Sequence, residues 1–98
     1  IADSMGAPLH CPESFAVCQK VVDEIVLVDD DALCQSMAVA FDSLKFTLEA
    51  AGAAVLAALA GPLKGQLTGQ RVAAILCGSN IDEATWLDLV ERGRQYGL

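Results

Sequence analysis

The residues with the clearest chemical potential form the short run Cys77-Gly78-Ser79-Asn80. This run follows five apolar residues at 72–76, a pattern typical of a buried strand. In open α/β sheets, ligands bind outside the carboxyl ends of the strands, and a glycine there lets a ligand approach the backbone. The thiol of Cys77 could then face a bound molecule. An ordinary strand-to-helix turn after a buried cysteine explains the same pattern, and spacing alone favours that simpler alternative.

Glu49 is the second residue of interest, because this acid stands between Leu48 and a run of alanines. A carboxylate that is partly buried there would need a hydrogen-bonding or charged partner. An acid at a helix end that reaches solvent is the open alternative. Asp3 and Ser4, near the start of the chain, are explained by turn chemistry when they are taken alone.

Composition argues against several kinds of ligand. Thirteen acids against six scattered bases give a formal charge of −7, whereas a compact nucleic-acid binder shows a basic patch. The four cysteines and the single histidine lack the close spacing of a zinc site, and helix capping explains the acids at 29–31 better than a cation does. We therefore expect no metal site and no nucleic-acid partner. The most apolar run, 50–60, is about half the length of a membrane span, so we also expect no membrane insertion.

Helix-capping and helix-breaking residues, together with the spacing of apolar residues, predict helices at 12–22, from Asp29 through Leu48, at 50–60 and at 83–92. Short apolar runs predict buried strands at 24–28 and 72–76. Alternation of helices and strands indicates an α/β protein with a parallel sheet. Since two strands do not make a stable sheet alone, the prediction is part of an open parallel sheet flanked by helices, incomplete in this chain.

Cysteine usage bears on the compartment. Cys18, Cys34 and Cys77 lie in apolar or helical runs, where a free thiol behaves as a small buried hydrophobe. The chain also opens without a basic leader segment. These observations favour a reduced, cytoplasmic compartment over a disulfide framework.

Four segments together resemble a known family. Residues 1–4, IADS, resemble the T-I-A-D-G segment of threonine dehydratases and serine racemases, and residues 22–28, VDEIVLV, resemble their V-D-[DE]-I-x-x-V strand. Residues 45–54, KFTLEAAGAA, resemble K-L-x-x-E-P-[AST]-G-A-[AG], and residues 77–82, CGSNID, resemble S-G-G-N-[VI]-D. The segments occur in the family's order and at about its spacing. The chain is thereby identified as similar to the threonine/serine dehydratase family of fold-type II pyridoxal-phosphate (PLP) enzymes.

The resemblance implies that residues 1–98 are a C-terminal fragment of a PLP-binding catalytic domain with a tryptophan synthase β-like fold. The family's Schiff-base lysine and its Gly-rich phosphate loop match nothing in this sequence. The resemblance therefore implies no catalytic residue within 1–98 and no turnover by this segment alone. The implied partners are a small amino-acid substrate, the remainder of the catalytic domain and, for the full-length protein, further copies in a homo-oligomer.

The resemblance also assigns cofactor-binding positions. Cys77 takes the place of the residue, usually Ser, that faces the pyridine nitrogen of PLP, and Gly78 and Asn80 match the family's turn. Glu49 matches a Glu on the pyridine side. Ser4 takes the place of a Gly whose backbone lies against one face of the ring, so its side chain is a departure from the family pattern.

The activity that the resemblance implies for the complete protein is dehydration and deamination of serine or threonine to a 2-oxo acid and ammonia. A racemase acting on serine or aspartate is the near alternative, because the same kind of site can return a proton from the other face. A non-catalytic α/β interaction module that kept the pattern and lost the chemistry is the alternative from a different class.

Residues 1–98 expressed alone are expected to self-associate, because 54% of the residues are hydrophobic and only 19% are charged, and because the predicted sheet is incomplete. Size-exclusion chromatography with light scattering checks this expectation. A monomer that melts cooperatively would contradict the incomplete-domain interpretation.

Overall fold

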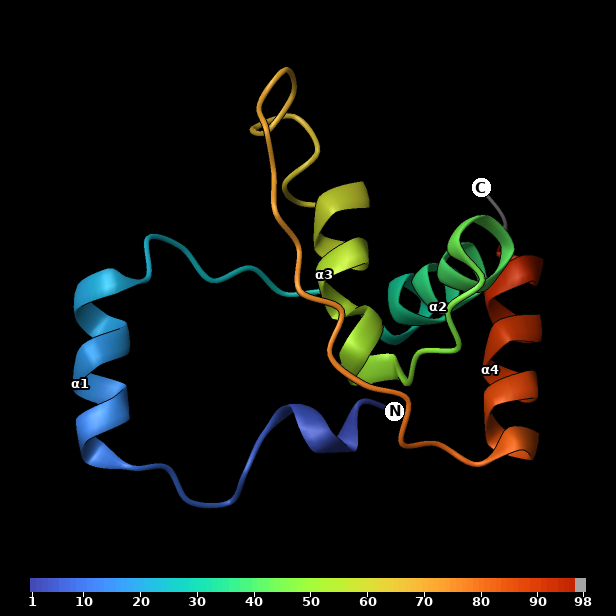
Figure 1. The fold of residues 1–98 in the computed structure, drawn as a ribbon, viewed down its shortest axis with the longest axis horizontal. Coiled ribbons are helices and arrows are strands. Elements are labelled where there is room, and N and C mark those ends of the chain that lie inside the picture. The colour runs from blue at the N-terminus through green and yellow to red at the C-terminus, as the bar shows by residue number, and fades with distance from the viewer. Residues whose placement is uncertain (97–98) are drawn as a thin grey trace.

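The structure, a computed structural model, describes residues 1–96 (Figure 1). The elements it contains are a short 3-10 helix and four α-helices: η1 (Asp3–Met5), α1 (Pro12–Val21), α2 (Asp30–Leu44), α3 (Ala50–Ala60) and α4 (Glu83–Gln95). The helices predicted at 12–22, 50–60 and 83–92 are confirmed, the last with a longer C-terminal end. Their starts are set by local chemistry, as at α1, where Pro12 occupies a first-turn position that needs no N–H donor.

Helix α2 begins at a side-chain cap and ends at a left-handed residue. The Asp29 carboxylate accepts a hydrogen bond from the Ala32 N–H at 2.8 Å, so the predicted cap is confirmed. The helix was predicted to continue through Leu48, and that prediction is wrong: Lys45 adopts φ 62° and ends the helix after Leu44. Leu48 nevertheless stays buried because the chain turns back onto the core.

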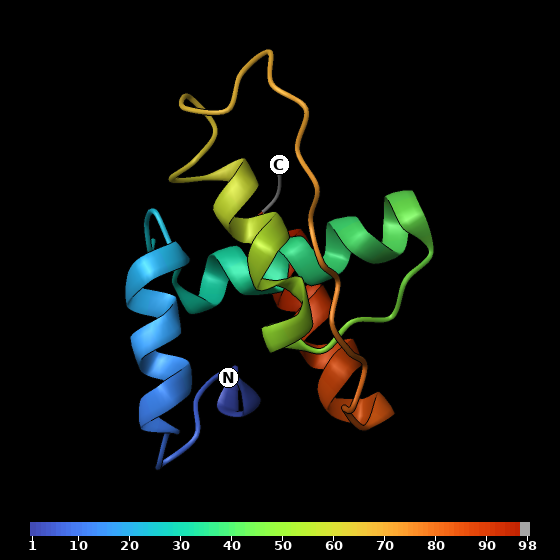
Figure 2. The same ribbon diagram turned by 60° about the vertical axis from the view of Figure 1, so that its left-hand side comes forward.

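The core lies where α2 packs between α3 and α4 (Figures 1 and 2). Its buried apolar side chains come from α2, the α2–α3 connection, α3 and α4: Leu33, Met37, Ala38, Ala40, Leu48, Ala50, Ala53, Ala57, Trp86 and Val90. All three α3 members are alanines, so α2 and α3 pack closely. At the α2–α4 crossing, a Cβ on Gly93 would collide with the Cys34 carbonyl, so this contact requires glycine.

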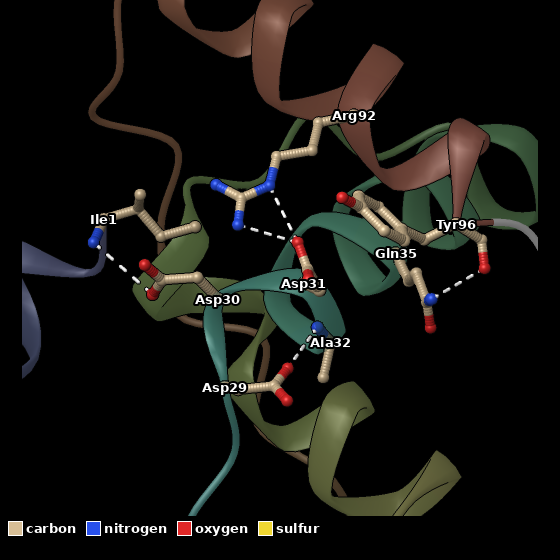
Figure 3. Close-up of polar contacts among 8 residues, drawn as sticks. All are labelled: Ile1, Asp29, Asp30, Asp31, Ala32, Gln35, Arg92 and Tyr96. Atoms are coloured by element: carbon tan, nitrogen blue, oxygen red, sulfur yellow. Dashed lines mark hydrogen bonds and ion pairs between the residues drawn. The ribbon is translucent and has the colours of Figure 1, made fainter.

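Polar contacts join α2 to α4 at the edge of this core (Figure 3). The Arg92 side chain donates its Nε–H to Asp31 Oδ1 at 2.8 Å, and its Nη2 lies 2.7 Å from the same oxygen. Gln35 donates to the Tyr96 carbonyl at 2.9 Å. Because both partners of the ion pair are about 40% exposed, we expect it to set the register of α4 more than to add stability.

Helix α1 stands apart from the other helices in Figure 1, and within residues 1–96 it packs against none of them. Its apolar side chains are accordingly exposed, Phe15 at 53%, Val17 at 56% and Val21 at 67%. The radius of gyration, 14.3 Å, exceeds the roughly 13 Å of a compact domain of this length. Helix α1 therefore keeps exposed apolar side chains and has no helix packed against it among the described residues.

The two segments predicted as strands, 24–28 and 72–76, contain no strand among the described residues. A strand requires a hydrogen-bonded neighbour, and neither segment has one here. Three of their apolar side chains lie largely open to solvent, Ile25 at 83%, Leu27 at 89% and Ile75 at 79%, whereas Val28 and Leu76 are half-buried against the core. The parallel sheet thus stays a prediction that residues 1–96 do not test.

The predicted burial of the cysteines holds for only one of the three. Cys34 is fully buried on α2, and this burial raises the pKa of its thiol. Cys18 and Cys77 are exposed, because α1 and the segment 72–76 have no covering element here. No helix within residues 1–96 combines the length and apolar character required to cross a membrane.

Candidate functional site

Glu49 joins three segments that are distant in sequence. It occupies the N-cap position of α3, and its backbone N–H donates to the Gly78 carbonyl at 3.0 Å. Its carboxylate Oε2 accepts a hydrogen bond from the Ser4 hydroxyl at 3.0 Å. Its side chain is half-buried, so the expectation of a partly buried acid with a partner is confirmed.

Two glycines make the approach of α3 to the 77–80 turn possible. A Cβ on Gly52 would lie 2.6 Å from the Gly78 carbonyl oxygen and 3.0 Å from its nitrogen. A Cβ on Gly78 would lie 3.1 Å from Glu49 Oε1. The first turn of α3 therefore rests directly on the backbone of the turn, and a side chain on Gly52 would force them apart.

An open hollow of about 290 Å³ borders this junction. Its lining comes from residue 1 and η1, from the start of α3, from the turn and the two residues after it, and from α4: Ile1, Asp3, Glu49, Ala50, Asn80, Ile81, Asp82, Thr85 and Leu89. It brings the predicted residue Asn80 to the same surface as Glu49. The residues that line the hollow are mixed in polarity: apolar side chains lie beside carboxylates and an amide.

The hollow carries negative charge. Its acids are Asp3, Glu49 and Asp82, and no lysine or arginine borders it in the part of the chain that the structure describes. Asp82 caps α4 by accepting hydrogen bonds from the Thr85 N–H at 2.9 Å and the Thr85 hydroxyl at 2.8 Å. The backbone bond first, and then the hydroxyl, lower the pKa of Asp82 and keep it ionised.

The structure brings three of the five predicted site residues, Ser4, Glu49 and Gly78, into one contact network and places Asn80 on the adjoining hollow. Cys77 precedes Gly78 in the chain, and its side chain is exposed, with no hydrogen bond to the other four among the described residues. Its role toward a cofactor stays a prediction.

The sequence interpretation gave no role to Gly52 or Thr85. Gly52 is the single glycine in a run of alanines and matches the glycine of the family's K-L-x-x-E-P-[AST]-G-A-[AG] segment, but neither feature indicates a contact with Gly78. Thr85 follows Asp82 at the spacing of a helix cap, but nothing local indicates that it borders a hollow.

Comparison with known proteins decides the relationship. The chain is 46% identical over 86 residues to phenylserine dehydratase from Ralstonia pickettii. It is 35% identical over 92 residues to the biosynthetic L-threonine dehydratase IlvA of Haemophilus influenzae, and 33% identical over 93 residues to L-threonine ammonia-lyase of Geobacter sulfurreducens. The chain is a homologue of a segment of these hydroxy-amino-acid dehydratases. The predicted resemblance to the threonine/serine dehydratase family is confirmed.

The matches cover 88%, 93% and 95% of this chain but only 26%, 18% and 23% of the three relatives. The chain thus spans about a quarter or less of the length of these relatives. No protein-family profile matches the chain, and no solved structure matches it.

In the full-length protein, replacement of Gly52 by alanine is expected to lower the free energy of unfolding by about 1–3 kcal/mol, because the new Cβ must displace the Gly78 carbonyl. Urea denaturation followed by circular dichroism measures the change. Gly65→Ala is the matched control, since a Cβ there meets nothing within 4 Å. Equal unfolding midpoints for Gly52→Ala and the wild type would contradict the close approach.

Proposed function

We propose that the complete protein is a PLP-dependent ammonia-lyase that dehydrates and deaminates serine or threonine to a 2-oxo acid and ammonia. The observation that carries the proposal is the homology to dehydratases along nearly the whole chain, together with the contact network of Ser4, Glu49 and Gly78 at the segments that resemble the family's motifs. The reported relatives are named for dehydration or ammonia release, which favours elimination over the racemase alternative.

The residues of the network fit the ring side of PLP. Gly78 adds no side chain of its own at the turn, where Glu49 Oε1 lies 3.1 Å from the position that a Cβ would take, and Glu49 and Asn80 border the nearby hollow. Cys77 is exposed at the same turn, and its thiol is a weak, neutral hydrogen-bond donor. These residues would hold the pyridine edge of the cofactor.

The same residues do not fit the phosphate of PLP. Phosphate sites use cationic side chains or the free N–H groups of a glycine-rich loop, whereas the side-chain charges on the hollow belong to Asp3, Glu49 and Asp82. We therefore assign the phosphate and the lysine that carries the cofactor to the remainder of the protein, and we assign no catalytic residue to 1–98.

When bound, PLP supplies an electron-accepting ring that stabilises negative charge at the substrate Cα after its proton is removed. Cys77 would contribute a neutral partner that leaves the pyridine nitrogen without a proton. The resulting electron acceptor is weaker than one paired with a carboxylate, and β-elimination tolerates this because the leaving hydroxyl carries charge away. Glu49, held through Ser4 and Gly78, would fix the position of the turn that presents Cys77.

We further propose that segments 24–28 and 72–76 are strands of an open parallel sheet whose other strands lie elsewhere in the complete protein. Several of their apolar side chains are exposed, which supports this proposal, as does the absence of any helix packed against α1 within residues 1–96. On this account, residues 1–98 form the C-terminal part of the PLP-binding domain and contact its remainder. A cytoplasmic location and a homo-oligomeric state belong to the same proposal and stay predictions.

The activity test uses the full-length protein with PLP and follows 2-oxo acid and ammonia from L-serine, L-threonine and 3-phenylserine. The third substrate is included because a phenylserine dehydratase is among the relatives. Both products, released in equal amounts from at least one substrate, are expected. Exchange of the α-hydrogen with inversion and without ammonia would favour the racemase, and failure to bind PLP would favour the non-catalytic module.

In the full-length protein, Cys77→Ser is expected to retain activity, because Ser is a neutral donor of similar size. Cys77→Asp is expected to lower kcat roughly 100-fold, because a carboxylate would keep a proton on the pyridine nitrogen and would bring a charge that the bound cofactor buries. Steady-state kinetics with the preferred substrate measure both. Cys77→Asn, a neutral side chain of the same shape as Asp, separates charge from size; comparable turnover by the Asp variant would contradict the assigned role.

A further inference from the structure

The hydrogen bond from Ser4 to Glu49 connects two residues 45 positions apart. Ser4 lies in η1, whose turn is closed by a bond of 3.1 Å from the Met5 N–H to the Ala2 carbonyl. Helix α3 contacts η1, and the serine hydroxyl reaches Glu49 Oε2 at 3.0 Å. The contact therefore ties the first segment of the chain to the start of α3.

The two oxygens of the Glu49 carboxylate face different segments. Oε2 is bound to Ser4, while Oε1 lies 3.1 Å from the position that a Cβ on Gly78 would take, so it faces the turn closely. The backbone of Glu49 is itself bonded to the Gly78 carbonyl. The Ser4 hydroxyl is thus the contact that orients the carboxylate, and the family pattern, which has glycine at this position, would leave that oxygen without the donor.

We propose that Ser4 is a positioning residue that orients the Glu49 carboxylate against Gly78 before the cofactor binds. The inference rests on the proposed function, because the network faces the cofactor only if the complete protein binds PLP. A glutamate side chain has several freely rotating bonds, and ordering it costs conformational entropy. If Ser4 already orders the Glu49 side chain, less conformational entropy is lost when the cofactor binds. The affinity for PLP should therefore depend on the Ser4 hydroxyl.

The experiment measures the PLP affinity of the full-length apoprotein by fluorescence titration, independently of turnover. Ser4→Ala removes the hydroxyl and is expected to weaken PLP binding about three- to tenfold. Ser4→Thr keeps a hydroxyl and is expected to retain wild-type affinity. Ser43→Ala, at an exposed serine of α2, is the matched control and is expected to change nothing. Thermal unfolding of each apoprotein shows whether a change in affinity follows from a change in folding.

A second comparison assigns the effect to Glu49. In a Glu49→Ala background the Ser4→Ala change is expected to have no further effect on PLP affinity, because the hydroxyl has lost its acceptor. A full effect that persists in that background would overturn the positioning role, as would equal affinities of the wild type and Ser4→Ala. A wild-type protein that binds no PLP would overturn the proposed function and this inference with it, so the two failures are distinguishable.

Discussion

The contact on which the candidate site depends is the one between the first turn of α3 and the backbone of Gly78. The Glu49 N–H binds the Gly78 carbonyl, and Gly52 lets the helix approach that carbonyl without a side chain between them. This is a backbone contact, and only glycine at position 52 permits the distance. Through it, the packed part of the chain holds a turn that has no strand partner in residues 1–96.

Helix α2 holds α3 and α4, the two helices that flank the 77–80 turn, in place. Among the described residues it is the only α-helix that packs against two other α-helices, with α3 on one side and α4 on the other. The close crossing at Gly93 and the Asp31–Arg92 pair fix α4 along it. Glu49 is the N-cap of α3, and α4 begins at Glu83, three residues after the turn. The packing of α2 against both helices therefore helps to hold the turn in place.

The starts of the helices could be predicted from the sequence because the determinants are local. Asp29 and Asp82 each cap a helix with a side-chain oxygen that reaches a backbone N–H three residues ahead. The end of α2 could not be predicted from the sequence. Its apolar spacing continues to Leu48, while Lys45 adopts a left-handed conformation that turns the chain toward the core. A helix end of this kind is decided by tertiary packing and carries no glycine to mark it.

The candidate site was predictable only in part for a related reason. Glu49 stood out as an acid in an apolar context, but its partner Ser4 is 45 positions away, and no local pattern indicates such a bond. The resemblance to the dehydratases placed both residues at a cofactor, whereas the hydrogen bond between them arises where this chain departs from the family's glycine. The segments predicted as strands, 24–28 and 72–76, depend on hydrogen-bonded neighbours, so their own residues do not decide whether they form strands.

The most direct test of the central claim is a crystal structure of the full-length protein with PLP bound. The account predicts that segments 24–28 and 72–76 pair as parallel strands and that the Cys77 thiol lies within hydrogen-bonding distance of the pyridine nitrogen, with Glu49 still bound to the Gly78 backbone. A cofactor located away from the 77–80 turn, or no bound cofactor at all, would contradict it.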